Sequence, residues 1–335
     1  MNTDNQIILT GNSSESTSLI NKMIRPKSEV DLIDFDRHYN YNFEGNEPLR
    51  EGCFSVSVDD VSFECFLRRS DERRLYVILG GGRWRGGELA PVPSFSKWEY
   101  YKIVPGNLLC IEDPMYIKYP ELVNGWFYGD NDVNYREITA NLIVKIANKL
   151  SISTNDIVIY SSLANTSASI HVASYIKGST LMAINPSIDL QDSKEYFGFK
   201  KAVGIDIREI DVFNRNNLYE YIINNKETTF ILAFNVVSKL DYENQAMKLF
   251  HKMSYTPKYG LNRLKNNLFV WIYEAPAVKD NPHISAESMV LFPMIDFLVR
   301  NVNKLNYDTL CNYCNVVNWN WQDYYQQRRI IASLK

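Results

Sequence analysis

The sequence is poor in the side chains from which metal sites and disulfide frameworks are built. It contains four histidines and five cysteines in 335 residues. An odd number of cysteines in a long chain is typical of reduced thiols that pack in a core. Cys311 and Cys314 form a lone CxxC, without a second pair or a nearby histidine. We therefore expect no zinc ion and no other bound metal.

The chain also lacks long apolar runs and an excess of basic residues. No run approaches the roughly 18 apolar residues of a membrane-spanning helix. The N-terminus has neither the basic start nor the apolar core of a secretory signal. The formal net charge of -3 argues against a general nucleic-acid-binding protein. We expect a cytoplasmic protein with no transmembrane segment and no nucleic-acid partner.

What the chain does contain is a series of continuous apolar runs that alternate with segments of helical periodicity. Residues 136–150 carry one apolar stripe at helical spacing, and helices are also expected up to about residue 176 and over residues 284–299. Strands and helices in alternation predict a mainly parallel sheet with helices on both faces. The predicted parallel strands are residues 75–82, 107–112, 156–160, 180–185, 229–236 and 267–273.

Residues 53–69 precede these strands and have a different pattern. Two runs of alternating apolar and polar residues flank Asp59 and Asp60, which predicts an antiparallel hairpin at the edge of the sheet. No clear interdomain linker follows, so one domain accounts for most of the chain. We expect a polar N-terminal segment over residues 1–45, an α/β domain over 46–300 and an aromatic C-terminal tail over 301–335, packed on the domain or on a partner.

Five segments follow one another in an order that is specific as a set. They are LYVILGGGRWRGG, CIEDPMY, GWFYGD, VIYSSLANTSASIHVASYIKGSTLMAINPSIDL and DNPHIS. With them, residues 73–298 resemble a family of α/β-hydrolase-like proteins of bacterial capsule and surface-polysaccharide biosynthesis. The resemblance implies an α/β-hydrolase-like fold, with the antiparallel hairpin at the start of a mainly parallel sheet.

The resemblance also locates the nucleophile elbow, where this sequence departs from the family. The family has Gly-x-Ser-x-Gly-Gly-Phe on the strained turn between a strand and a helix. An alignment without gaps places Leu163 at the nucleophile position, and leucine cannot attack a carbonyl group. A shift by one residue makes Ser162 the nucleophile, but it places Tyr160 where a small residue is needed.

The remaining catalytic residues are implied by the same resemblance. His283, in DNPHIS, takes the place of the general base, and Asp241 is a candidate for the triad acid. Backbone N–H groups of Gly81, Gly82 and Ala164 are candidates for an oxyanion hole. The family has a histidine where this chain has Gly80, which belongs to the same glycine loop.

Two further groups are candidates for substrate binding. Arg83 and Trp84 lie beside the glycine loop, where an arginine could hold an anionic glycan or a phosphate. Trp126 and Tyr128 could present flat aromatic faces to sugar rings, or Trp126 could pack under the carboxyl edge of the sheet. GGGRWRGG fits neither of the glycine patterns that cradle nucleotide phosphates, so we expect no nucleotide cofactor.

Three functions are consistent with these residues. The first is an accessory protein or pseudoenzyme of capsule biosynthesis that binds a surface polysaccharide, its precursor or a partner protein. The second is an active O-acetyltransferase or esterase that uses a Ser-His-Asp triad. The third is a component of a glycosyltransferase system. A glycosyltransferase or a second copy of the chain is a candidate partner in any of these functions. Fold alone does not choose among them.

Overall fold

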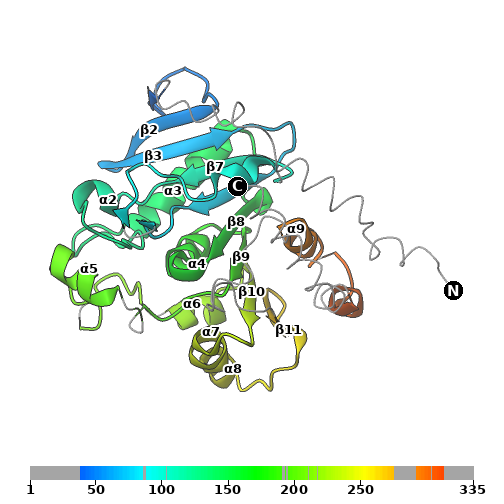
Figure 1. Cartoon of the computed structure of the whole chain (residues 1–335). Helices are drawn as coiled ribbons and strands as arrows, with labels where there is room; N and C mark the ends of the chain where they lie inside the picture. The colour runs from blue at the N-terminus through cyan, green and yellow to red at the C-terminus, as the bar shows by residue number, and fades with distance from the viewer. Residues whose placement is uncertain are drawn as a thin grey trace, which may run out of the picture.

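A computed structural model describes residues 38–85, 88–102, 104–190, 193, 195–209, 211–216, 218–274, 292–302 and 304–312. Its centre is a ten-stranded sheet in the order β1-β2-β3-β7-β4-β8-β9-β10-β12-β11 (Figure 1). None of the helices within these ranges is long and apolar enough to cross a membrane.

The six central strands are parallel and correspond to the six predicted ones. Almost every residue in them is buried, because helices or loops cover both faces of this part of the sheet. The prediction of a mainly parallel α/β-hydrolase-like sheet is therefore confirmed. The strands are β7 (Asn107–Ile111), β4 (Leu75–Leu79), β8 (Ile157–Ser162), β9 (Thr180–Ile184), β10 (Thr229–Asn235) and β12 (Leu268–Tyr273).

Antiparallel strands flank this parallel core. The predicted hairpin is formed by β2 (Gly52–Val58) and β3 (Val61–Arg68), and β3 pairs antiparallel with β7. Asp59 and Asp60 both have positive φ, 49° and 62°, as a two-residue type I′ turn requires. At the opposite edge, β11 (Gly260–Lys265) pairs antiparallel with β12 and was not predicted.

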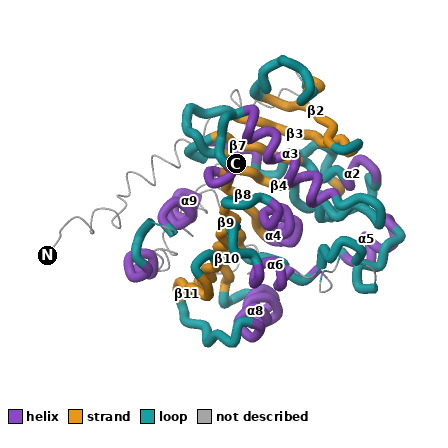
Figure 2. The backbone as a smooth tube through the Cα atoms, turned by 180° about the vertical axis from the view of Figure 1, so that it is seen from behind, coloured by secondary structure: helices purple, strands orange, loops and turns teal. Residues whose placement is uncertain are grey.

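Helices cover the two faces of the sheet in separate groups. Helices α3 (Tyr135–Lys149), α4 (Thr166–Tyr175), α6 (Leu218–Asn224) and α8 (Met247–Lys252) lie on one side, and α9 (Phe292–Asn301) lies on the other (Figures 1 and 2). Each face has its own hydrophobic core. The shorter elements are β1 (Tyr39–Tyr41), β5 (Trp84–Arg85), β6 (Glu88–Leu89), η4 (Trp98–Lys102), α2 (Met115–Lys118), η5 (Thr154–Asp156), η6 (Leu163–Asn165), α5 (Tyr196–Val203), α7 (Lys239–Asp241) and the π-helical turn η8 (Tyr242–Ala246).

Both ends of the described chain are attached to the sheet. Strand β1 lies within the segment expected to be irregular and pairs with β2. In the tail, Leu310 is buried and the Tyr307 hydroxyl donates to Leu261 O in β11 at 2.6 Å. The first part of the tail therefore packs on the domain. Its later aromatic residues lie outside the described residues.

Candidate functional site at the carboxyl edge of the sheet

The turn between β8 and α4 keeps the shape of an elbow, and its strained residue is Leu163. Leu163 has a φ of 58°, in the left-handed region that bulky residues seldom adopt. Ser162 is the last residue of β8, with extended backbone angles of -149° and 153°. The left-handed position therefore belongs to Leu163, as the alignment without gaps predicts. Asn165 and Thr166, which replace the glycine pair of the family, are both buried.

Ser162 instead lies beside a lysine from another loop. Lys97 Nζ donates a hydrogen bond to Ser162 Oγ at 2.9 Å. Lys97 is itself left-handed, with a φ of 64°, as is Phe95 with 42°. The Glu112 carboxylate holds this loop, because its Oε2 accepts from the backbone N–H groups of Ser94 and Phe95 at 2.7 and 2.9 Å. The loop thus brings an amine to the serine that precedes the elbow.

The glycine loop after β4 packs closely against other segments of the same chain. Gly81 N points to Ser96 Oγ at 3.4 Å, and Gly81 O accepts from the Tyr116 hydroxyl at 3.1 Å. A Cβ atom on Gly82 would lie 2.4 Å from Asn124 Oδ1. Ala164 directly follows Leu163, the position that supplies an oxyanion N–H in an elbow of this type.

Gly80 stands where the family has a histidine because there is no space for a side chain. A Cβ atom there would lie 2.9 Å from Glu112 Oε1 and 3.1 Å from Ile111 O. Gly80 N also donates to Ile111 O at 2.6 Å, which brings the two backbones together. Gly80 therefore supplies no side chain at this position of the loop.

We predict that Gly80→Ala lowers the free energy of unfolding by about 1–3 kcal/mol, the usual cost of overpacking. Gly198, inside α5, is the matched control because a Cβ atom there meets nothing within 4 Å. Gly198→Ala should be stabilising by about 0.5–1 kcal/mol through helix propensity. Urea unfolding of both variants measures the difference, and equal effects would contradict the crowding at Gly80.

Of the candidate acid and base, the structure describes only the acid, Asp241. Asp241 is buried at the end of α7, and its Oδ2 accepts from the Ser238 hydroxyl at 2.5 Å. This bond makes Asp241 part of the turn after β10. His283 lies outside the described residues. The described chain contains no group of three or more histidine, cysteine, aspartate or glutamate side chains that could hold a metal ion.

The proposed sugar platform is wrong for a physical reason. Trp126 and Tyr128 have no exposed surface, and both rings pack against Phe199 of α5. Trp126 and Phe127 have left-handed φ values of 54° and 50°, which turn this segment into the core. The motif therefore builds the interior of the protein and offers no aromatic face to a ligand.

The anion-binding interpretation of Arg83 is also corrected. Arg83 is only 6% exposed, and its guanidinium donates to backbone carbonyls. Its Nε and Nη2 donate to Ala90 O at 2.9 and 2.6 Å, and its Nη1 donates to Pro120 O at 2.6 Å. Arg83 joins two loops. The neighbouring Trp84 lies in β5, and its side chain lies outside what the structure describes.

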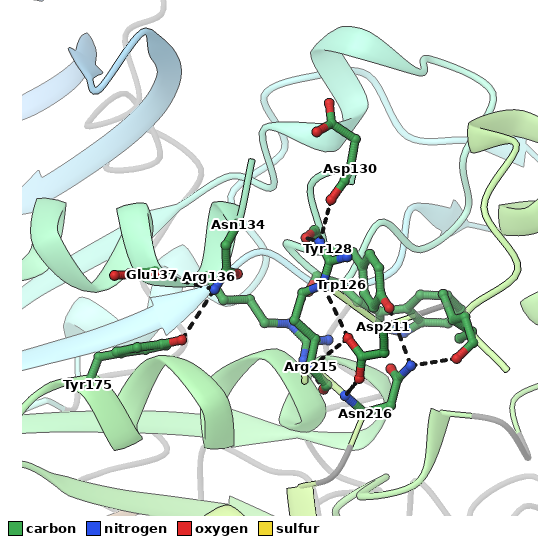
Figure 3. A network of polar contacts seen from close by, with 11 residues as sticks. Trp126, Tyr128, Asp130, Asn134, Arg136, Glu137, Tyr175, Asp211, Arg215 and Asn216 are labelled. Carbon is green, nitrogen blue, oxygen red and sulfur yellow. Dashed lines mark hydrogen bonds and ion pairs between the residues drawn. The ribbon is translucent and has the colours of Figure 1, made fainter. Parts of the chain in front are cut away.

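Two buried arginines, which the sequence did not single out, hold the Gly-Trp-Phe-Tyr-Gly segment (Figure 3). Arg136 Nε donates to Trp126 O at 3.0 Å, and its Nη1 donates to Arg215 O at 2.7 Å. Arg215 Nη1 donates to Tyr128 O at 2.5 Å and to Asp130 O at 2.8 Å. The Arg215 guanidinium also lies 3.7 Å from the centroid of the Tyr128 ring. Carbonyl groups of a buried loop thus receive charged donors.

The mainly parallel sheet and the left-handed residue at the turn between β8 and α4 form an α/β-hydrolase-like fold. No protein-family model matches the sequence, and no curated protein is significantly similar to it.

Solved structures do show the same fold. The chain is similar to the capsule O-acetyltransferase of Neisseria meningitidis serogroup A, with a TM-score of 0.52 and 13% identity over 77% of this chain and 97% of that chain. It is also similar to the acylaminoacyl peptidase of Pyrococcus horikoshii, with a TM-score of 0.50 and 11% identity over 79% of this chain and 44% of the peptidase. For the dipeptidyl peptidase 4 of Porphyromonas gingivalis the TM-score is 0.50 and the identity 7%, over 76% of this chain and 35% of the peptidase. The chain therefore spans nearly the whole acetyltransferase but less than half of each peptidase.

Proposed function

We propose that this chain is a non-catalytic α/β-hydrolase-like protein of surface-polysaccharide biosynthesis, which binds a glycan or a partner of the assembly machinery. One observation carries the proposal: Leu163 occupies the left-handed position of the elbow. A leucine there has no hydroxyl with which to form an acyl-enzyme. Loss of the nucleophile removes most covalent acceleration and leaves only the effects of binding and oxyanion contacts.

The capsule connection of the proposal has two supports. One is the succession of family-like segments along the sequence. The other is the shared fold with a capsule O-acetyltransferase, which extends over 97% of that chain. A hydrolase fold without its nucleophile still keeps loops at the carboxyl edge of the sheet, where ligands of such folds bind. Binding is therefore the activity that this chain retains in our proposal.

The test is labelling with a fluorophosphonate probe, which forms a covalent bond with an activated serine. We expect no labelling of the wild-type protein under conditions that label an active serine esterase. We also expect the unlabelled protein to bind a surface glycan or a co-purified assembly partner. Labelling of the wild type that disappears in Ser162→Ala would overturn the proposal.

A second function, acyl transfer through Ser162, is favoured by one specific contact. Lys97 Nζ lies 2.9 Å from Ser162 Oγ, within the range for proton transfer between a serine and a lysine base. Labelling that is lost in both Ser162→Ala and Lys97→Met would support this function. Labelling lost in Ser162→Ala and His283→Ala, but not in Lys97→Met, would indicate a Ser-His arrangement instead.

A further inference from the structure

A pocket of about 740 Å³ lies between the segment after β9, the segment before α6 and helix α8, and its volume is within the usual range of small-molecule sites. Asp189, in the segment after β9, forms one wall. Arg208, Glu209 and Asp211, in the segment before α6, form a second wall. Lys248, on α8, belongs to the third. None of these residues was a candidate from the sequence.

The same segment after β9 contacts both the elbow and the pocket. Ser187 N lies 3.4 Å from Leu163 O, the carbonyl of the elbow residue. Ile188 N and Asp189 N donate to Gln245 Oε1 at 3.0 and 2.9 Å. Gln245 belongs to the π-helical turn η8, and such turns are frequent at functional sites. One short segment therefore connects the elbow, through Ser187, with the lining of the pocket, through Asp189.

The charges that line the pocket are mixed in sign. Three permanent cations face four carboxylates and one histidine. Such a lining does not favour a phosphate or another strongly anionic ligand, because the carboxylates would repel it. Carboxylates accept hydrogen bonds, lysine and arginine donate them, and a hydroxyl group does both. A ligand with many hydroxyl groups and little net charge satisfies this lining best.

The wall that carries Asp211 and Asn216 is held rigidly (Figure 3). Asp211 Oδ1 and Oδ2 accept from Arg215 N and Asn216 N, each at 2.6 Å. Asn216 Nδ2 donates to Ile207 O at 2.5 Å and to the Tyr128 hydroxyl at 3.3 Å. The bond to Ile207 O fixes the backbone directly before Arg208 and Glu209, so this wall needs little ordering when a ligand binds.

We infer that this pocket binds a neutral sugar segment of a glycan, through the exposed side chains of Arg208, Glu209 and Glu243. The inference rests on the proposed function, because it names the site and the class of glycan that the non-catalytic protein recognises.

The experiment uses the full chain and a printed array of defined oligosaccharides. The array contains neutral oligosaccharides of hexose and N-acetylhexosamine, and anionic oligosaccharides that contain uronate or sialate. We expect neutral oligosaccharides to bind in preference to anionic ones. Calorimetry with the best neutral oligosaccharide should show a loss of at least about tenfold in affinity for Arg208→Ala and for the double variant Glu209→Gln, Glu243→Gln.

The control is Glu227→Gln, an exposed carboxylate outside the pocket that pairs with Lys177 at 3.1 Å. Its affinity should equal that of the wild type, and all variants should keep the wild-type thermal midpoint. Unchanged affinity in the pocket variants would overturn the pocket site but leave the proposed function intact. A preference for anionic oligosaccharides, or no binding to the array, would also overturn the inference. Fluorophosphonate labelling decides the loss of acyl transfer separately.

Discussion

Arg215→Ala is expected to lower the free energy of unfolding by about 3–5 kcal/mol. The side chain is fully buried, and its Nη1 is a donor to two carbonyl oxygens, Tyr128 O and Asp130 O. Each buried acceptor that loses its partner costs about 1–3 kcal/mol, and the cavity left by the side chain adds to this. The stack on the Tyr128 ring is lost as well. Guanidinium chloride unfolding measures the change.

Two further variants separate the causes. Arg215→Met keeps most of the volume but none of the donors, so it should be nearly as unstable as Arg215→Ala. Arg68→Ala removes an arginine that forms an exposed ion pair with Glu51, and it should cost no more than about 1 kcal/mol. If Arg215→Met were as stable as the wild type, packing rather than hydrogen bonding would be the contribution of Arg215.

The sequence predicted the parallel sheet because buried parallel strands have an unambiguous pattern. Runs such as LYVIL and TFILAFN are apolar at most or all positions. Short continuous apolar runs of this kind are typical of strands that are buried on both faces. Strand β11 has no such pattern, since GLNRLK is half polar and lies at an edge with exposed residues. Its pairing with β12 became visible only in three dimensions.

The elbow and the arginine cluster show why sites are harder to predict than strands. Two alignments of the elbow, one residue apart, are compatible with the sequence. The positive φ of Leu163 distinguishes them, and a backbone angle is not visible in a sequence. Arg136 and Arg215 are 79 residues apart, and a buried arginine has the same local sequence signal as an exposed one. Trp126 and Tyr128 were misread for the same reason, because an aromatic motif does not reveal which side of it faces water.

The second large effect is a pH dependence of stability that originates at Asp113. This carboxyl group is fully buried after β7, and burial raises its pKa from 3.8 to about 7. Backbone donors oppose the shift: Met115 N donates to Oδ1 at 3.0 Å and Phe127 N to Oδ2 at 2.9 Å. Gly125 keeps the loop close, because a Cβ atom there would lie 2.6 Å from Asp113 Oδ2.

A raised pKa in the folded state means that the folded protein holds this proton more tightly than the unfolded chain does. Its contribution to stability is therefore fully present below about pH 3.8 and is lost as the pH rises through about 7. The difference between these pKa values corresponds to about 4 kcal/mol. Around neutral pH the folded protein thus contains a buried carboxyl group in mid-titration.

The measurement is urea unfolding of the wild type and Asp113→Asn between pH 4 and 8. Asparagine keeps the shape of the side chain but cannot ionise, so the wild type should lose up to about 4 kcal/mol relative to this variant as the pH rises. Asp130 and Asp206, whose pKa values are lowered, titrate in both proteins and cancel in the difference. Asp132→Asn, an exposed substitution in the loop after the Gly-Trp-Phe-Tyr-Gly segment, is the control. Its free energy of unfolding should change with pH as that of the wild type does. Parallel curves for the wild type and Asp113→Asn would show that Asp113 is ionised throughout this range, and that the two backbone donors outweigh its burial.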